Sequence, residues 1–108
     1  MKRFEICYVE LMDSGCSVQK GLRPCLIASN DVACKHSPVI VVVPITTAKK
    51  SNIPTHMNIM LKKPSTILFE QFISIAKDRI GNKIGELPKY LYGEAENKMQ
   101  LSLGISKS

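Results

Sequence analysis

The chain has 108 residues, and 44% of them are hydrophobic. This length and composition indicate a single globular domain spanning residues 1–108, and they exclude an intrinsically disordered chain. Lys and Arg number 15 against 9 Asp and Glu, which gives a formal net charge of +6. Such a charge favours a polyanionic partner such as nucleic acid, but it does not identify one.

In the first half of the chain, segments typical of strands alternate with polar segments. The expected strands are Glu5–Leu11, Pro24–Ala28 and Val39–Val43. The last of these is β-branched throughout, which predicts a strand buried on both faces. The polar stretches at 12–20 and 29–38 predict loops, and Asn30-Asp31 predicts a turn within the second.

Two more strands are expected in the second half, at Met57–Leu61 and Thr66–Phe69, with a basic turn between them. Phe72–Ile75 either extends the second strand or turns a corner. The assignment of residues 76–85 stays open, because helical and turn features mix there with two glycines.

A helix is expected after Pro88, a residue that suits the first turn of a helix. Beyond it, Leu91, Ala95 and Met99 recur at every fourth position and form one apolar stripe, which predicts core contacts. Several short strands followed by one helix indicate a mainly β fold, a small barrel with a C-terminal helix.

The cysteines and the apolar segments bear on the cellular compartment. The four cysteines are Cys7, Cys16, Cys25 and Cys34, and no two form a Cys-x-x-Cys pair. We therefore expect free thiols and no metal site, with Cys7 and Cys25 packed on strands. No segment predicts a signal peptide or a membrane span, so a cytoplasmic location with no membrane partner is expected.

Arg23 and Thr46 are the residues that point to chemistry. Each stands at one end of an expected strand, and two such strands lying side by side would bring them together. Arginine suits phosphate because its planar guanidinium offers several donors and keeps its charge. The residues by themselves thus predict an anion site on a small β fold.

Six short motifs also occur in an order and spacing that resemble those of the MazF/PemK family, toxins of toxin–antitoxin pairs. They are Gly21-Leu22-Arg23-Pro24, Asn30-Asp31, Ser37-Pro38, Pro44-Ile45-Thr46, Pro54-Thr55-His56 and Glu70-Gln71. The resemblance covers nearly the whole chain, since Leu101–Gly104 also matches the usual ending of the family.

This resemblance implies an SH3-like barrel that forms a homodimer. It implies an endoribonuclease that cuts single-stranded RNA (mRNA) at a short sequence, without a metal or other cofactor. Attack by the 2′-hydroxyl would leave a cyclic phosphate and a 5′-hydroxyl. A cognate antitoxin would lay a disordered segment over the active site.

By the same resemblance, Arg23 and Thr46 match the catalytic residues of the family. We expect Arg23 to stabilise negative charge in the transition state, and it could also donate a proton to the leaving group. The general base stays open, with His56 and Glu70 as candidates. The residues expected to bind RNA are Ser17, Gln19, Lys20, Ile53, Pro54, His56, Ser65, Glu70 and Gln71.

The chain departs from the family pattern at four positions around these motifs. Phe4 stands where the family has a glycine, Val18 replaces a carboxylate, Ile73 an arginine and Ala76 an aspartate. Val18, Ile73 and Ala76 keep one alternative open, a member that binds RNA or an antitoxin without cutting. A second alternative is a toxin of the same fold that binds DNA gyrase, as CcdB does, but retention of Arg23-Pro24 with Thr46 argues against it.

Overall fold

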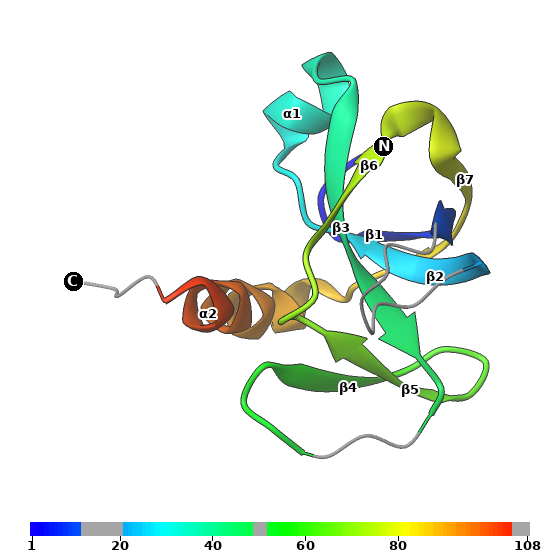
Figure 1. The fold of residues 1–108 in the computed structure, drawn as a ribbon. Helices are drawn as coiled ribbons and strands as arrows, with labels where there is room; N and C mark the ends of the chain where they lie inside the picture. Colours follow the sequence, from blue (N-terminus) through cyan, green and yellow to red (C-terminus); the bar gives the residue numbers. More distant parts are fainter. Residues whose placement is uncertain (12–20, 49–51, 105–108) are drawn as a thin grey trace.

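The computed structural model describes residues 1–11, 21–48 and 52–104, and they form a curled antiparallel sheet with a helix at the C-terminal end (Figure 1). Within these residues, the strands are β1 (Glu5–Leu11), β2 (Gly21–Ile27), β3 (Val39–Thr46), β4 (His56–Met60), β5 (Pro64–Leu68), β6 (Ile73–Ala76) and β7 (Ile80–Glu86). The helices are α1 (Asp31–His36), α2 (Tyr92–Leu103) and the 3-10 turns η1 (Lys77–Arg79) and η2 (Lys89–Leu91). None of these helices is long and apolar enough to cross a membrane.

Strand β3 is the centre of the sheet. The strands follow the order β4-β5-β3-β2-β1-β7, and β6 also pairs with β3. The first half of β3 pairs with β6, its middle with β2, and its last residues, Ile45 and Thr46, with β5. A single long strand with three partners bends the sheet, so that the β4–β5 hairpin lies at the opposite end of β3 from α1 (Figure 1). The predicted mainly β barrel with a C-terminal helix is confirmed.

The curled sheet has a hydrophobic core on each face, because side chains alternate along a strand. The first core includes Leu26, Val43 and Ile45, and α2 packs there with Ala95 and Met99. The second core is made of Cys7, Val9, Leu11, Cys25, Ile27, Cys34, Ile40, Val42 and Ile75. Since β3 contributes to both cores, the prediction of a strand buried on both faces is confirmed for Ile40, Val42 and Val43, but it is wrong for Val39, which is 48% exposed.

The cysteines that the structure describes behave as small apolar side chains. Cys7 and Cys25 are directly opposite each other on β1 and β2, and both are buried, as is Cys34. All three are free thiols, as predicted. Burial raises the pKa of each thiol, and that of Cys25 reaches about 12. Cys16 lies outside the described residues.

The loop predicted at 29–38 is wrong, because α1 occupies Asp31–His36. Asn30 and Asp31 are typical of turns, but they are equally suited to a helix start. The Asn30 side chain accepts a hydrogen bond from the backbone N–H of Ala33 at 2.8 Å and so caps the helix. The acidic Asp31 in the first turn and the basic residues in the last turn complement the helix dipole.

The structure also settles the segments whose assignment stayed open. Phe72–Ile75 turns a corner, since β6 leaves β5 and pairs with β3 instead. Residues 76–85 hold η1 and most of β7, and β7 pairs with β1 at the other edge of the sheet. The predicted C-terminal helix is present as η2 followed by α2, and it ends at Gly104, whose φ of 72° is a common helix stop.

Phe4 has the left-handed backbone conformation, with φ of 71°. This conformation disfavours any residue with a Cβ, which gives a physical reason for the glycine that the family has at this position. Here the ring is 2% exposed and lies 4.6 Å from the ring of Tyr92 on α2. The Phe4 backbone also donates to Ile27 and accepts from Leu87, so it joins β2 to the end of β7. Burial and these two hydrogen bonds hold the residue in place.

Candidate functional site

Arg23 and Thr46 lie on neighbouring strands, and each stands two residues beyond the last pair of the β2–β3 ladder. β2 and β3 are antiparallel, with Cys25 opposite Pro44. Arg23 precedes Cys25 by two residues and Thr46 follows Pro44 by two, so both lie at the same end of this ladder. Arg23 is exposed, and Thr46 is half-buried with its Oγ1 accepting the backbone N–H of Ala48 at 3.1 Å. A cation and a hydroxyl therefore lie at the same end of two neighbouring strands.

The same row continues onto two further strands. Thr46 is opposite Thr66 on β5, and Thr66 is opposite Asn58 on β4. Residues directly opposite in an antiparallel ladder point to the same face. The residues next to them, Ile45 and Ile67, are in the first core, so the row points to the other face. We call Arg23, Thr46, Thr66 and Asn58 the polar row.

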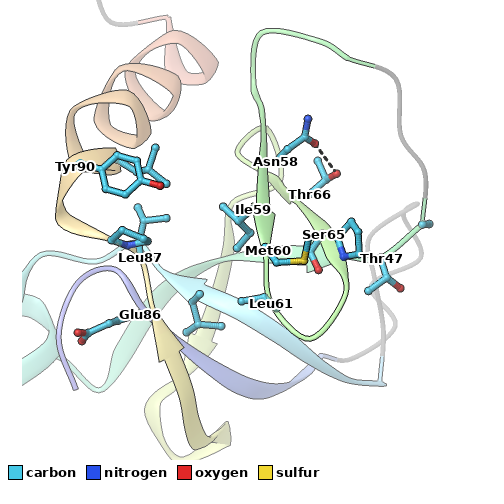
Figure 2. A pocket seen from close by; sticks show the side chains of 15 residues that line it. Thr47, Asn58, Ile59, Met60, Leu61, Ser65, Thr66, Glu86, Leu87 and Tyr90 are labelled. Carbon is cyan, nitrogen blue, oxygen red and sulfur yellow. Dashed lines mark hydrogen bonds between the residues drawn. The ribbon is translucent and has the colours of Figure 1, made fainter.

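Sequence reasoning missed Thr66 and Asn58 as members of this site. Thr66 is among the few buried polar residues that the structure describes, at 9% exposure, whereas Asn58 is exposed. The Thr66 hydroxyl donates to Asn58 Oδ1 at 3.1 Å (Figure 2). A polar residue at an outward position of an expected strand was the only available signal, and it becomes informative only with the register of β4, β5 and β3.

His56 and Glu70, the two candidates for a general base, are hydrogen-bonded to each other. His56 Nε2 lies 2.9 Å from Glu70 Oε2, and Thr55 donates to Glu70 Oε1 at 3.1 Å. An ionised carboxylate only accepts hydrogen bonds, so Nε2 carries the proton. The His56 side chain is 8% exposed. His56 lies on β4 two residues before Asn58, so its side chain is on the same face of the sheet as the polar row. Its partner on β5 is Leu68, two residues after Thr66.

The pKa of Glu70 reflects two opposed effects. Burial alone would raise the pKa of this carboxyl. Hydrogen bonds from His56, from its own backbone and from Thr55 outweigh burial, so the pKa of Glu70 lies below its ordinary value of 4.5. Glu70 is therefore ionised at neutral pH and holds the imidazole of His56 in one orientation.

The remaining residues expected to bind RNA lie in different surroundings. Ile53 and Pro54 are exposed in the segment before β4, and the Pro54 carbonyl accepts a hydrogen bond from Lys98 Nζ on α2 at 2.7 Å. Ser65 is buried, and its hydroxyl donates to the Lys63 carbonyl. Gln71 Oε1 is buried and has no hydrogen-bond partner among the described residues. Three of the predicted residues, Ser17, Gln19 and Lys20, lie outside the described residues.

A cavity of about 750 Å³ opens between the β4–β5 hairpin and the segment that joins β7 to α2 (Figure 2). Its walls are largely apolar and include Ile59, Leu87 and Tyr90, while Asn58 and Thr66 border it on the hairpin side. Arg23, Thr46 and His56 are not part of its lining. The cavity thus adjoins the end of the polar row formed by Asn58 and Thr66. Arg23 and Thr46, the predicted anion site, lie outside it on an open face of the sheet.

Carboxylates and thiols do not gather at this face. In residues 1–11, 21–48 and 52–104, no three His, Cys, Asp or Glu side chains come together in a way that could hold a metal ion. The exposed basic residues Lys62 and Lys63 form the turn between β4 and β5. Together with the net charge of +6, they make an anionic ligand more favourable near the hairpin.

A curled β sheet with a C-terminal helix is the fold that this chain shares with solved structures of MazF proteins. The family described as PemK-like, MazF-like toxin of type II toxin-antitoxin system matches residues 2–103. The chain belongs to this family, and the predicted resemblance is confirmed.

Particular relatives agree with this assignment. Two curated relatives are called endoribonuclease MazF. That of Staphylococcus saprophyticus is 35% identical over 97% of this chain and 92% of its own length, and that of Staphylococcus epidermidis is 34% identical over 98% and 93%. Among solved structures, a mycobacterial endoribonuclease in complex with its cognate antitoxin has a TM-score of 0.82 at 20% identity and covers 100% of this chain and 99% of that one. MazF of Deinococcus radiodurans has a TM-score of 0.83 at 18% identity over 97% of both chains. The last two support the fold.

Proposed function

We propose that this chain is a toxin that cleaves single-stranded RNA, and that Arg23 and Thr46 carry out the cleavage. Family membership and the relatives called endoribonuclease support the activity. The observation that carries the assignment to these residues is the polar row, in which Arg23 on β2 and Thr46 on β3 each lie two residues beyond the last pair of the β2–β3 ladder, on one open face. The 108 residues act as one domain.

The reaction needs no group beyond those of the RNA and the protein. The 2′-hydroxyl oxygen attacks the adjacent phosphorus, and the bond from phosphorus to the 5′ oxygen breaks. The hydroxyl proton goes to a base, and the leaving oxygen takes up a proton, which gives a 2′,3′-cyclic phosphate and a 5′-hydroxyl. Metal-independent cleavage of this kind depends on stabilising the charge that builds up on the phosphate oxygens.

Arg23 and Thr46 suit that task. The guanidinium is exposed and offers parallel N–H donors to two phosphate oxygens. The Thr46 hydroxyl already accepts the Ala48 N–H, so its own proton is free to be donated to a third oxygen. Arg23 does not serve as the base, because a guanidinium keeps its proton. The hydrogen bond to Glu70 holds the His56 imidazole in one orientation and engages its Nε2 proton, so Nε2 is not the atom that takes up the substrate's proton.

Binding and regulation follow from the same surface. Lys62 and Lys63 attract the RNA backbone, which makes affinity fall with salt. A cognate antitoxin inhibits the toxin by covering the polar row; an antitoxin as partner is supported by the mycobacterial endoribonuclease that was solved in complex with its cognate antitoxin. The chain works as a homodimer in the cytoplasm.

Cleavage of a long single-stranded RNA in EDTA tests the proposal. The wild-type chain should cut, and Arg23→Ala should lose about 100- to 1000-fold in rate, the usual effect of removing one donor to a developing charge. Arg23→Lys should recover little, because a point charge does not replace the planar fork. Lys35→Ala is the control, since it removes an exposed cation from α1, which lies at the opposite end of β3 from Thr46 (Figure 1).

Three results would overturn the proposal. Binding of RNA by the wild-type chain without cleavage would favour the non-cutting alternative. Inhibition of gyrase supercoiling without cleavage would favour the gyrase-binding alternative. Equal rates for the wild-type chain and Arg23→Ala would remove Arg23 from the reaction.

A further inference from the structure

We infer that Asn58, held by Thr66, reads one base of the RNA beside the cut and selects a keto base (uracil or guanine) over an amino base (cytosine or adenine). This inference rests on the proposed function, because it takes the polar row as the place where RNA is cut. It adds a specificity residue, Asn58, and a positioning residue, Thr66.

The register places Asn58 at the right distance from the reaction. Asn58 is opposite Thr66, and Thr66 is opposite Thr46, so Asn58 stands two strands away from Thr46 on the same face. Two strand spacings amount to about 10 Å. That separation is too large for Asn58 to touch the phosphate held by Thr46, and it suits contact with a neighbouring nucleotide. In single-stranded RNA the base edges are free to be read in this way.

The hydrogen bond between Thr66 and Asn58 fixes which atoms of the amide are presented. Thr66 is 9% exposed, so its hydroxyl proton needs a partner within the protein. That partner is Asn58 Oδ1, at 3.1 Å. The oxygen end of the amide is therefore occupied, and the –NH2 end is left to face outward from an exposed residue on the edge strand β4.

An amide fixed in this way turns its –NH2 donors toward a ligand, while Oδ1 is turned toward Thr66. A keto oxygen at C4 of uracil or C6 of guanine accepts from that –NH2 group. The amino groups at the same positions of cytosine and adenine are donors themselves, and they would leave two donors facing each other. One good hydrogen bond against an unpaired group corresponds to about a 10-fold preference. A freely rotating asparagine would lack this preference, because it could present either end.

Mapping of cleavage sites tests the inference. The wild-type chain cleaves a long RNA of mixed sequence under single-hit conditions, and the 5′-hydroxyl ends are sequenced to give the base frequencies at each position around the cut. We expect one position with about a 10-fold excess of uracil and guanine. Asn58→Asp keeps the acceptor for Thr66 but offers only acceptors to the RNA. It should shift the same position toward cytosine and adenine. The added negative charge should slow cleavage at all sites by the same factor, so it does not change the ratio of base frequencies at that position.

Thr66 supplies the matched pair of variants. Thr66→Ser keeps the hydroxyl and should keep the keto preference, whereas Thr66→Val keeps the shape and should abolish the preference by freeing the amide. A role of Thr66 in stability alone would change the rate and the melting temperature without changing base frequencies. Unchanged frequencies in Asn58→Asp, or equal frequencies in the two Thr66 variants, would overturn the inference. If the wild-type chain cuts no RNA, the proposed function itself fails.

Discussion

Phe4 allows backbone strain to be separated from core packing by two substitutions at one position. The residue combines φ of 71° with a side chain that is 2% exposed. Removing a buried Phe costs about 3–5 kcal/mol in either Phe4→Ala or Phe4→Gly. A residue with a Cβ in the left-handed region costs about 1–2 kcal/mol, which Gly avoids. Gly loses about 0.5–1 kcal/mol of that advantage through the entropy of the unfolded chain.

The two variants should therefore rank in an unusual order. Both lose stability, but we expect Phe4→Gly to be more stable than Phe4→Ala by about 0.5–1 kcal/mol. Urea denaturation gives this difference directly, and it corresponds to a few degrees, on the order of 2–5 °C, in melting temperature. The control pair is Glu96→Ala and Glu96→Gly on the exposed face of α2, where Gly should be the less stable by about 1 kcal/mol. If Ala is the more stable residue at both positions, backbone strain at Phe4 is not the reason for the glycine of the family.

Three further outcomes are expected. Thr46→Val should slow RNA cleavage about 100-fold while Thr46→Ser retains most of the rate, because only Val lacks the donor; equal rates in a single-turnover assay would exclude the hydroxyl from the reaction. The ionised carboxylate of Glu70 stabilises the fold above its ordinary pKa of 4.5, and this contribution disappears as the pH falls through the lowered value. Glu70→Gln should therefore flatten the acid side of a plot of urea midpoint against pH, and an unchanged acid side would contradict the pairing. In a Cys16→Ser background, the thiols of Cys7, Cys25 and Cys34 should react with Ellman's reagent only as fast as the protein unfolds, since burial raises the pKa of all three; labelling within seconds under native conditions would show that they are accessible.

The local sequence predicts most of the strands, but it does not predict the helix α1 that lies between two of them. The β-branched run at Val39–Val43 predicts a buried strand, and its flanking polar turns predict the approach of Arg23 to Thr46. Asn30 shows the limit of such reasoning, since one side chain suits a turn and a helix cap equally well. The six residues of α1 that follow Asn30 are too few to show an apolar period that would decide between a turn and a helix.

The pair formed by Thr66 and Asn58 could not be identified until the register of the strands was known. Neither residue belongs to a recognised motif, and a single polar side chain on a strand does not by itself indicate a site. Their role depends on the register between β3, β5 and β4, which is set by the turn at 61–63 and by core contacts of Ile67. A shift of one residue would point both side chains into the core. The sequence thus predicts which residues are reactive more readily than which residues surround them.

Thr46 and Asn58 should differ in how well they tolerate substitution, because β3 is a central strand and β4 is an edge strand of the sheet. Thr46 lies on the strand that contributes to both cores, so its backbone should exchange amide hydrogens only when the whole protein unfolds. Asn58 lies on β4, which pairs with β5 alone in the described chain, and substitutions there should be tolerated at little cost in folding free energy. Mutation could therefore alter which RNA sequences are cut while the chemistry of cutting stays protected by the stability of the fold.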